Sequence, residues 1–120
     1  MLEINMEFRK GILFIRLIGE LTKKTYQKLN DEVTIMIKEN GIRNIVFNIE
    51  KLNKIDMKGI SFLYYNYELC NYNKGKIMIC GFQNEKVKNR IKNSRLLNYM
   101  YEVSSELTAI DQFNEEDICK

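Results

Sequence analysis

The chain begins with two runs of apolar residues whose spacing is that of β-strands. In residues 2–8, LEINMEF, every second residue is apolar, which predicts a half-buried strand. A second apolar run over residues 12–18 follows a short polar break that ends in Gly11. Two such runs with a brief glycine-containing gap predict an antiparallel hairpin.

The apolar period then lengthens to three and four residues, which indicates an amphipathic helix. We predict this helix from about Thr22 to Glu39, with Thr22 as its N-cap and Asn40-Gly41 as its C-terminal stop. A short β-branched strand is predicted next over residues 44–49, and a loop over residues 50–56 follows it.

Asp56 stands at the end of this loop, where its carboxylate is placed to accept a backbone N–H of the next helix. We predict that helix over residues 57–73. The remaining predicted elements are a buried strand at 76–81, a basic helix at 84–94, a short strand at 101–103 and a helix that Ser105 caps and that reaches about Phe113.

The order of these elements predicts the fold class. Alternating strands and helices of this length imply parallel strands with right-handed crossovers, and the opening hairpin adds an antiparallel edge. We therefore predict one α/β domain over residues 1–120, with a mixed β-sheet and about four α-helices. Its core covers about residues 3–112, and residues 113–120 form an acidic C-terminal tail.

Composition argues against catalysis. The chain of 120 residues contains no histidine, which is the commonest general base and the commonest metal ligand. No glycine-rich phosphate-binding motif and no Cys/His cluster is present, so we expect no enzyme, no metal and no cofactor. The three cysteines, Cys70, Cys80 and Cys119, form no CxxC pair, and we interpret them as reduced thiols.

The distribution of apolar residues and charge bounds the partners. No apolar run is long enough to span a membrane, and the acidic N-terminus is unlike a signal peptide, so we expect a cytoplasmic protein without membrane association. The net charge of +3 is mild. A basic cluster nevertheless falls on the predicted helix at 84–94 and just after it: Lys86, Lys88, Arg90, Lys92 and Arg95.

Three interpretations of this basic cluster remain open at the level of sequence. It is a solvated helix face, an electrostatic docking surface for an acidic protein, or a nucleic-acid surface. The last is the least favoured and we expect no nucleic-acid partner, because no aromatic stacking platform accompanies the charges.

Four stretches together resemble a known family: Ile15–Leu21, Thr25–Val33, Ile42–Ile49 and Ile55–Ile60. In order and spacing they are similar to STAS domains, which occur in anti-sigma factor antagonists, stressosome subunits and the cytoplasmic ends of anion transporters. The resemblance runs from about residue 3 to residue 112. For a stand-alone domain it implies an antagonist that binds an anti-sigma factor kinase and is switched off by phosphorylation of a serine.

The chain departs from the family at the positions that carry this switch. Antagonists typically have Asp-Ser-Ser-Gly at the start of the second helix, where the second hydroxyl accepts phosphate. This chain has Asp56-Met57-Lys58-Gly59, so Lys58 stands at the phosphoacceptor position and cannot be a substrate for a serine kinase. The Gly-Glu-Leu-Asp of the family is also altered, because Thr22 stands at the position of its aspartate.

The resemblance places the partner-binding surface at two junctions between strands and helices. The predicted contact residues are Glu20, Thr22, Thr25, Asn53, Asp56, Met57, Lys58, Gly59, Ser61 and Phe62. Lys58 is either a solvated lysine or a cation that contacts an acidic partner. Ser61 and Thr22 are alternative phosphoacceptors, and for Thr22 the N-cap role is the simpler interpretation.

We expect a regulatory protein-binding module that acts without the serine switch and whose partner is an anti-sigma factor kinase or a related regulatory protein. The alternative is a ligand-binding or anion-binding domain, or a homo-oligomer that assembles as a stressosome-like scaffold. A homo-oligomer would use the edge strand of the hairpin or the helix that carries the tyrosines Tyr64, Tyr65, Tyr67 and Tyr72.

Overall fold

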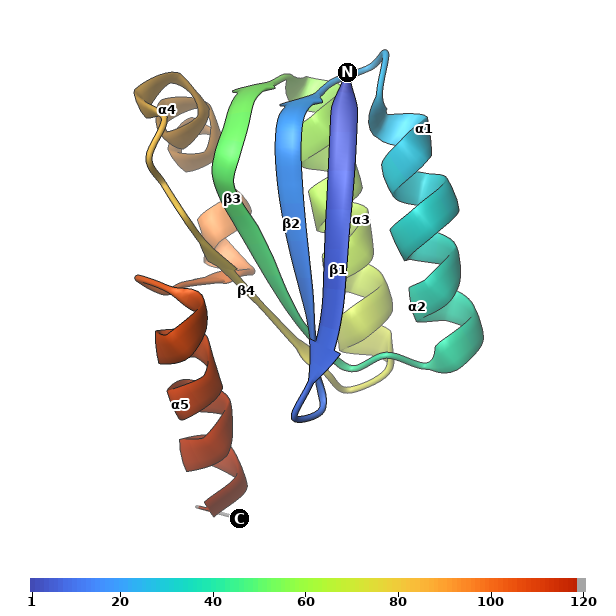
Figure 1. Cartoon of the computed structure of the whole chain (residues 1–120), viewed down its shortest axis with the longest axis vertical. Coiled ribbons are helices and arrows are strands. Elements are labelled where there is room, and N and C mark those ends of the chain that lie inside the picture. Colours follow the sequence, from blue (N-terminus) through green and yellow to red (C-terminus); the bar gives the residue numbers. More distant parts are fainter. Residues whose placement is uncertain (119–120) are drawn as a thin grey trace.

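A five-stranded mixed sheet forms the centre of the molecule (Figure 1). The computed structural model describes residues 1–118, with side chains described for residues 1–114. The strands are β1 (Leu2–Arg9), β2 (Ile12–Leu21), β3 (Asn44–Ile55), β4 (Lys76–Cys80) and β5 (Tyr101–Glu102), and they lie in this order across the sheet. β1 pairs antiparallel with β2, and the other neighbours pair in parallel, which confirms the predicted mixed sheet.

Helices cover both faces of this sheet. They are α1 (Tyr26–Leu29), a π-helical turn (Asn30–Thr34), α2 (Ile35–Asn40), α3 (Met57–Tyr72), α4 (Glu85–Asn93), a 3₁₀ turn (Leu96–Asn98) and α5 (Glu106–Ile118). α1 to α4 pack on one face through the larger hydrophobic core, and α5 packs on the other face through a smaller one (Figure 1). In the part of the chain that the structure describes, no helix combines the length and apolar character required to cross a bilayer.

The first helix begins later than predicted, at Tyr26 instead of Thr22. The hydroxyl of Thr25 accepts a hydrogen bond from the N–H of Thr22 at 2.9 Å and donates one to the carbonyl of Glu20 at 2.8 Å. These bonds hold residues 22–25 as a turn, so Thr22 is not the N-cap of the helix.

β3 is twice as long as predicted, because residues 50–55 belong to the strand and not to a loop. The end of β2 pairs with this extension, with Gly19 opposite Leu52 and Leu21 opposite Ile55. Leu52 and Ile55 are buried, which gives the extension its place in the core. The last helix also continues past Phe113 to Ile118, and Cys119 lies outside the described residues.

The start of α3 lies against the end of β2 more closely than a side chain would permit. A Cβ atom added at Gly59 would collide with the backbone carbonyl of Leu21 and come within 3.0 Å of Ile55 Cγ1. The absence of a side chain at Gly59 therefore sets the distance between the helix and the strand.

Gly59→Ala is expected to destabilise the protein by about 1–3 kcal/mol, the usual cost of overpacking a well-packed interior. The measurement is the free energy of unfolding from urea denaturation. The matched control is Ser61→Ala, an exposed position two residues later in the same helix, where we expect a change within about 0.5 kcal/mol. An equal loss in both variants would contradict the close approach at Gly59.

Candidate functional site

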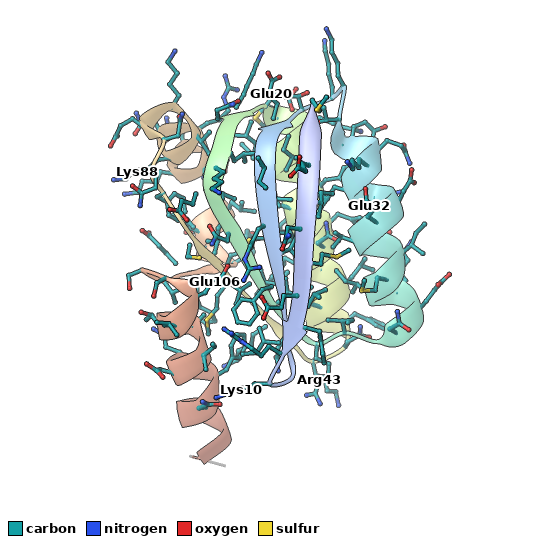
Figure 2. All side chains as sticks on the ribbon, viewed as in Figure 1. Lys10, Glu20, Glu32, Arg43, Lys88 and Glu106 are labelled. Atoms are coloured by element: carbon teal, nitrogen blue, oxygen red, sulfur yellow. The ribbon has the colours of Figure 1, made fainter. Side chains whose placement is uncertain are left out.

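The junctions predicted to carry function lie at one end of the molecule. The carboxyl ends of the parallel strands β2 and β3 meet there, as in other open α/β sheets, and α1 and α3 begin there. In Figure 2 the side chain of Glu20 lies at this end, and those of Lys10 and Arg43 lie at the opposite one. A cavity of about 440 Å³ opens here and is lined by Glu20, Asn53, Lys54, Ile55, Asp56, Lys86, Val87 and Arg90.

Asp56 ties the two junctions together. One carboxylate oxygen accepts the N–H of Gly59 at 2.9 Å and thereby caps α3, as predicted. The other accepts the N–H of Lys23 at 2.9 Å, in the turn between β2 and α1. Partial burial acts to raise the pKa of Asp56, but hydrogen bonds from the backbone N–H groups of Gly59, Lys23 and Lys58 outweigh it, and the pKa lies below its ordinary value.

Lys58 is exposed, yet its ammonium group does not extend freely into solvent. Nζ lies 4.8 Å from the ring centroid of Tyr26 on α1 and 5.7 Å from that of Phe62 on α3. The two rings contact each other with centroids 4.6 Å apart. A cation over an exposed ring gains about 0.5–1 kcal/mol. That gain is comparable to the roughly 0.3–1 kcal/mol that a cation loses near the positive end of a helix.

The predicted contact residues divide by exposure. Asn53, Met57, Lys58 and Ser61 are exposed, and Glu20, Thr25, Asp56 and Phe62 are partly exposed. Thr22 and Gly59 are buried, so in this structure they support the surface instead of forming it. The side chain of Thr22 is 6% exposed and its hydroxyl accepts the N–H of Lys24, which leaves it out of reach of a kinase without local unfolding. Ser61 is accessible, and its hydroxyl donates to the carbonyl of Met57.

Two residues of the basic cluster, which were not among the predicted contact residues, also lie at this end of the molecule. They are Lys86 and Arg90 on α4, and they line the same cavity as Asp56. With Met57 they also line a second cavity of about 700 Å³, together with Asn89, Asn93, Ser94 and Arg95. Crossovers between parallel strands are right-handed, so successive helices lie side by side on one face of the sheet. This rule could have predicted that α4 lies beside the start of α3.

Comparison with known proteins identifies the family. The sequence model of the STAS domain family matches residues 3–110 of this chain. The chain belongs to the STAS domain family. An anti-sigma F factor antagonist from Paenibacillus polymyxa is 27% identical to it over 111 residues, which cover 92% of this chain and 94% of the relative.

Solved structures share the fold of this STAS domain. The anti-sigma factor antagonist SpoIIAA in its unphosphorylated form covers 95% of this chain and 98% of its own, with 17% identity and a TM-score of 0.71. An anti-sigma factor antagonist from Mycobacterium paratuberculosis covers 93% of both chains, with 13% identity and a TM-score of 0.82. A variant of the RsbS protein of Moorella thermoacetica covers 96% and 97%, with 13% identity and a TM-score of 0.75.

Three helix starts of this STAS domain are capped by side chains of the chain itself, whereas α1 has no side-chain cap. Asp56 caps α3, the side chain of Asn84 accepts the N–H of Val87 in α4, and the hydroxyl of Ser105 accepts the N–H of Thr108 in α5. Because these caps use backbone donors that a bound anion would need, the three starts do not favour the alternative of an anion-binding domain.

The remaining chemistry-bearing groups do not form a site. Within the described residues, no three His, Cys, Asp or Glu side chains are grouped closely enough to hold a metal ion. Cys70 and Cys80 are free and buried. Burial raises the pKa of the Cys70 thiol to about 12 and that of Cys80 to about 11, so both are protonated near neutral pH.

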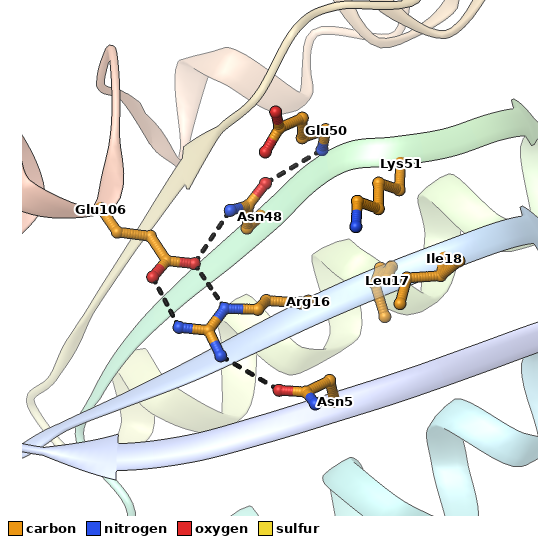
Figure 3. A pocket seen from close by; sticks show the side chains of 8 residues that line it. All are labelled: Asn5, Arg16, Leu17, Ile18, Asn48, Glu50, Lys51 and Glu106. Atoms are coloured by element: carbon orange, nitrogen blue, oxygen red, sulfur yellow. Dashed lines mark hydrogen bonds and ion pairs between the residues drawn. The ribbon is translucent and has the colours of Figure 1, made fainter.

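A third cavity, of about 390 Å³ and away from the functional end, lies on the sheet face that α5 covers (Figure 3). Arg16 on β2 donates two hydrogen bonds to the carboxylate of Glu106 on α5, at 2.9 and 2.8 Å, and Asn48 on β3 donates a third at 2.8 Å. The hydrogen bond from Arg16 lowers the pKa of Glu106, against the opposing effect of burial. These polar groups satisfy one another, so we interpret the cluster as the anchor of α5.

Asp56→Ala is expected to lower the free energy of unfolding by about 1 kcal/mol at pH 7, the usual cost of removing an N-cap. The folded pKa of Asp56 is lowered, so its contribution is complete above the unfolded value of about 3.9 and is lost as the pH falls through the folded value. The gap between wild type and variant in urea denaturation should therefore close in strong acid. A gap of the same size at pH 7 and pH 2 would contradict this role.

Glu106→Ala is expected to cost about 2 kcal/mol at pH 7, because it removes hydrogen bonds to a charged group and leaves Arg16 without its bidentate partner. The pKa of Glu106 is also lowered, so this difference should likewise shrink in strong acid. Thermal unfolding followed by circular dichroism measures the difference in stability between wild type and Glu106→Ala. The control is Glu102→Ala on β5, an exposed carboxylate, and an equal effect of both changes would disprove the anchor.

Proposed function

We propose that this STAS domain is a cytoplasmic regulatory protein that acts by binding another protein, an anti-sigma factor kinase or a related regulator. It is not an enzyme. The proposal is supported by membership in the family and by a relative that is named as an anti-sigma F factor antagonist. Two of the solved structures that share its fold also belong to proteins described as anti-sigma factor antagonists.

The partner binds at the end of the molecule where β2 and β3 finish. The exposed and partly exposed residues of the first turns of α3 supply the contacts, with Met57, Lys58 and Phe62 at the centre. Met57 is 62% exposed, so its side chain is available for a partner to cover.

The domain works without a serine switch at position 58, and the placement of Lys58 is the observation that carries this part of the proposal. Its ammonium group lies over the rings of Tyr26 and Phe62, in the first turn of α3. The family's phosphoacceptor serine would stand at this residue. A structure of SpoIIAA in a phosphorylated form shares the fold, with a TM-score of 0.72. Here a permanent positive charge takes the place of a hydroxyl that can gain negative charge.

The decisive experiment is isothermal titration calorimetry against an anti-sigma factor kinase from the same organism, followed by incubation with that kinase and ATP and intact-mass analysis. We expect wild type to bind and to gain no phosphate. Lys58→Ser is expected to change the affinity or to create a phosphoacceptor, because it restores a hydroxyl at the start of α3.

The matched control is Lys92→Ser, which removes an exposed lysine on α4 that lines neither cavity at this end. It should leave both affinity and mass unchanged. Unaltered binding and phosphorylation in Lys58→Ser would contradict the role of Lys58. Phosphate on Ser61 or Thr22 in protein purified from its native host would show that the domain does carry a switch.

A further inference from the structure

The second cavity at the functional end is a groove between the start of α3 and α4, which we call the Met57 groove. It measures about 700 Å³ and is lined by Met57, Lys86, Asn89, Arg90, Asn93, Ser94 and Arg95. Three of these residues are cations and none is acidic. Its one large apolar side chain, Met57, is exposed.

Among the described residues, the cations of the groove form no ion pair, and two acidic side chains, Glu20 and Asp56, line the neighbouring cavity with two of them. The ion pairs found in this part of the chain join Glu7, Glu32 and Glu106 to Arg9, Arg16 and Lys28, all away from α4. Lys86, Arg90 and Arg95 take part in none of them. Lys86 and Arg90 are four residues apart on one face of α4, where like charges repel each other slightly in the absence of a partner.

The four basic residues of α4 fall in two pairs, one on each side of its buried stripe. Lys86, Asn89, Arg90 and Asn93 recur at three and four residues and line the groove. Val87 and Ile91 are buried in the core. Lys88 and Lys92 are neither buried nor among the residues that line the groove. One pair, Lys86 and Arg90, therefore borders the groove, and the other pair lies on the opposite side of the buried stripe.

The groove thus places an exposed apolar side chain from α3 beside three cations from α4 and the turn that follows it, and protein interfaces combine apolar contacts with complementary charge in this way. We propose that the Met57 groove binds an acidic segment of the protein partner. The carboxylates of the segment pair with Lys86, Arg90 and Arg95, and one apolar side chain covers Met57. This inference rests on the proposed function, since it names the chemistry of the partner at the same end of the molecule.

A nucleic acid fits the groove less well than an acidic polypeptide. Unpaired bases bind by stacking on aromatic rings, and no aromatic residue lines the groove within the described part of the chain. The rings of Tyr26 and Phe62 already contact the ammonium group of Lys58.

The test uses a fluorescein-labelled synthetic peptide, Glu-Glu-Leu-Glu-Glu, titrated into the full chain and followed by anisotropy at low and high salt. The double variant Lys86→Glu/Arg90→Glu is expected to weaken binding at least tenfold. The matched control Lys88→Glu/Lys92→Glu makes the same change in net charge on the rest of α4 and should weaken it less than about threefold, because its charges lie away from the groove. Equal losses in the two variants would overturn the proposal and indicate attraction by net charge alone.

Met57→Ala separates recognition of the apolar side chain from recognition of charge. This variant should bind Glu-Glu-Leu-Glu-Glu more weakly than wild type does. It should bind a second peptide, of five glutamates, with unchanged affinity. Tighter binding of a single-stranded oligonucleotide than of the peptide, lost in the same double variant, would overturn the proposal in favour of nucleic acid.

The same variants distinguish this inference from the proposed function. If the kinase binds wild type and Lys86→Glu/Arg90→Glu with equal affinity, the groove proposal fails and the proposed function stands. If the peptide binds in the groove but the kinase binds no form of the protein, the proposed function fails and the groove belongs to a different acidic partner.

Discussion

The candidate surface depends on the close approach of α3 to the end of β2. Gly59 permits it, because a Cβ at this position would collide with the carbonyl of Leu21. Asp56 then secures it from both sides, with one oxygen on the start of α3 and the other on the turn that leads to α1. A single carboxylate thus fixes the relative positions of two chain segments 33 residues apart. Lys58 reaches the ring of Tyr26 only because both segments are held in this way.

Sequence alone predicts those features that neighbouring residues determine. The periods of two and of three to four residues locate the strands and helices, and the Asp56 cap depends on residues within one turn. The error at β3 arises where distant residues decide, because residues 50–55 extend the strand by pairing with the end of β2. The error at Thr22 is local. Thr25 bonds back to Glu20, five residues earlier, and the resulting turn competes with an N-cap at Thr22.

The candidate site shows the same limit. The functional segment at residues 53–60, which forms the end of β3 and the start of α3, follows from its place at the end of a parallel strand, and most of its predicted residues are accessible. The burial of Gly59 and the aromatic environment of Lys58 do not follow, because Leu21 and Tyr26 come from other elements. The sequence shows that the helix at 84–94 is basic, but only the fold shows that part of it lies beside Met57.

Charge at the start of α3 connects these features. A phosphoserine carries about −1.5 to −2 charges at neutral pH and gains or loses them by enzymatic reaction. Lys58 carries a positive charge that phosphorylation does not alter, and it directly follows Met57, which lines the groove. A partner surface with negative charge would therefore meet attraction at this end of the domain at all times. In the proposed function, binding is therefore controlled by concentration and ionic strength instead of by phosphorylation at position 58.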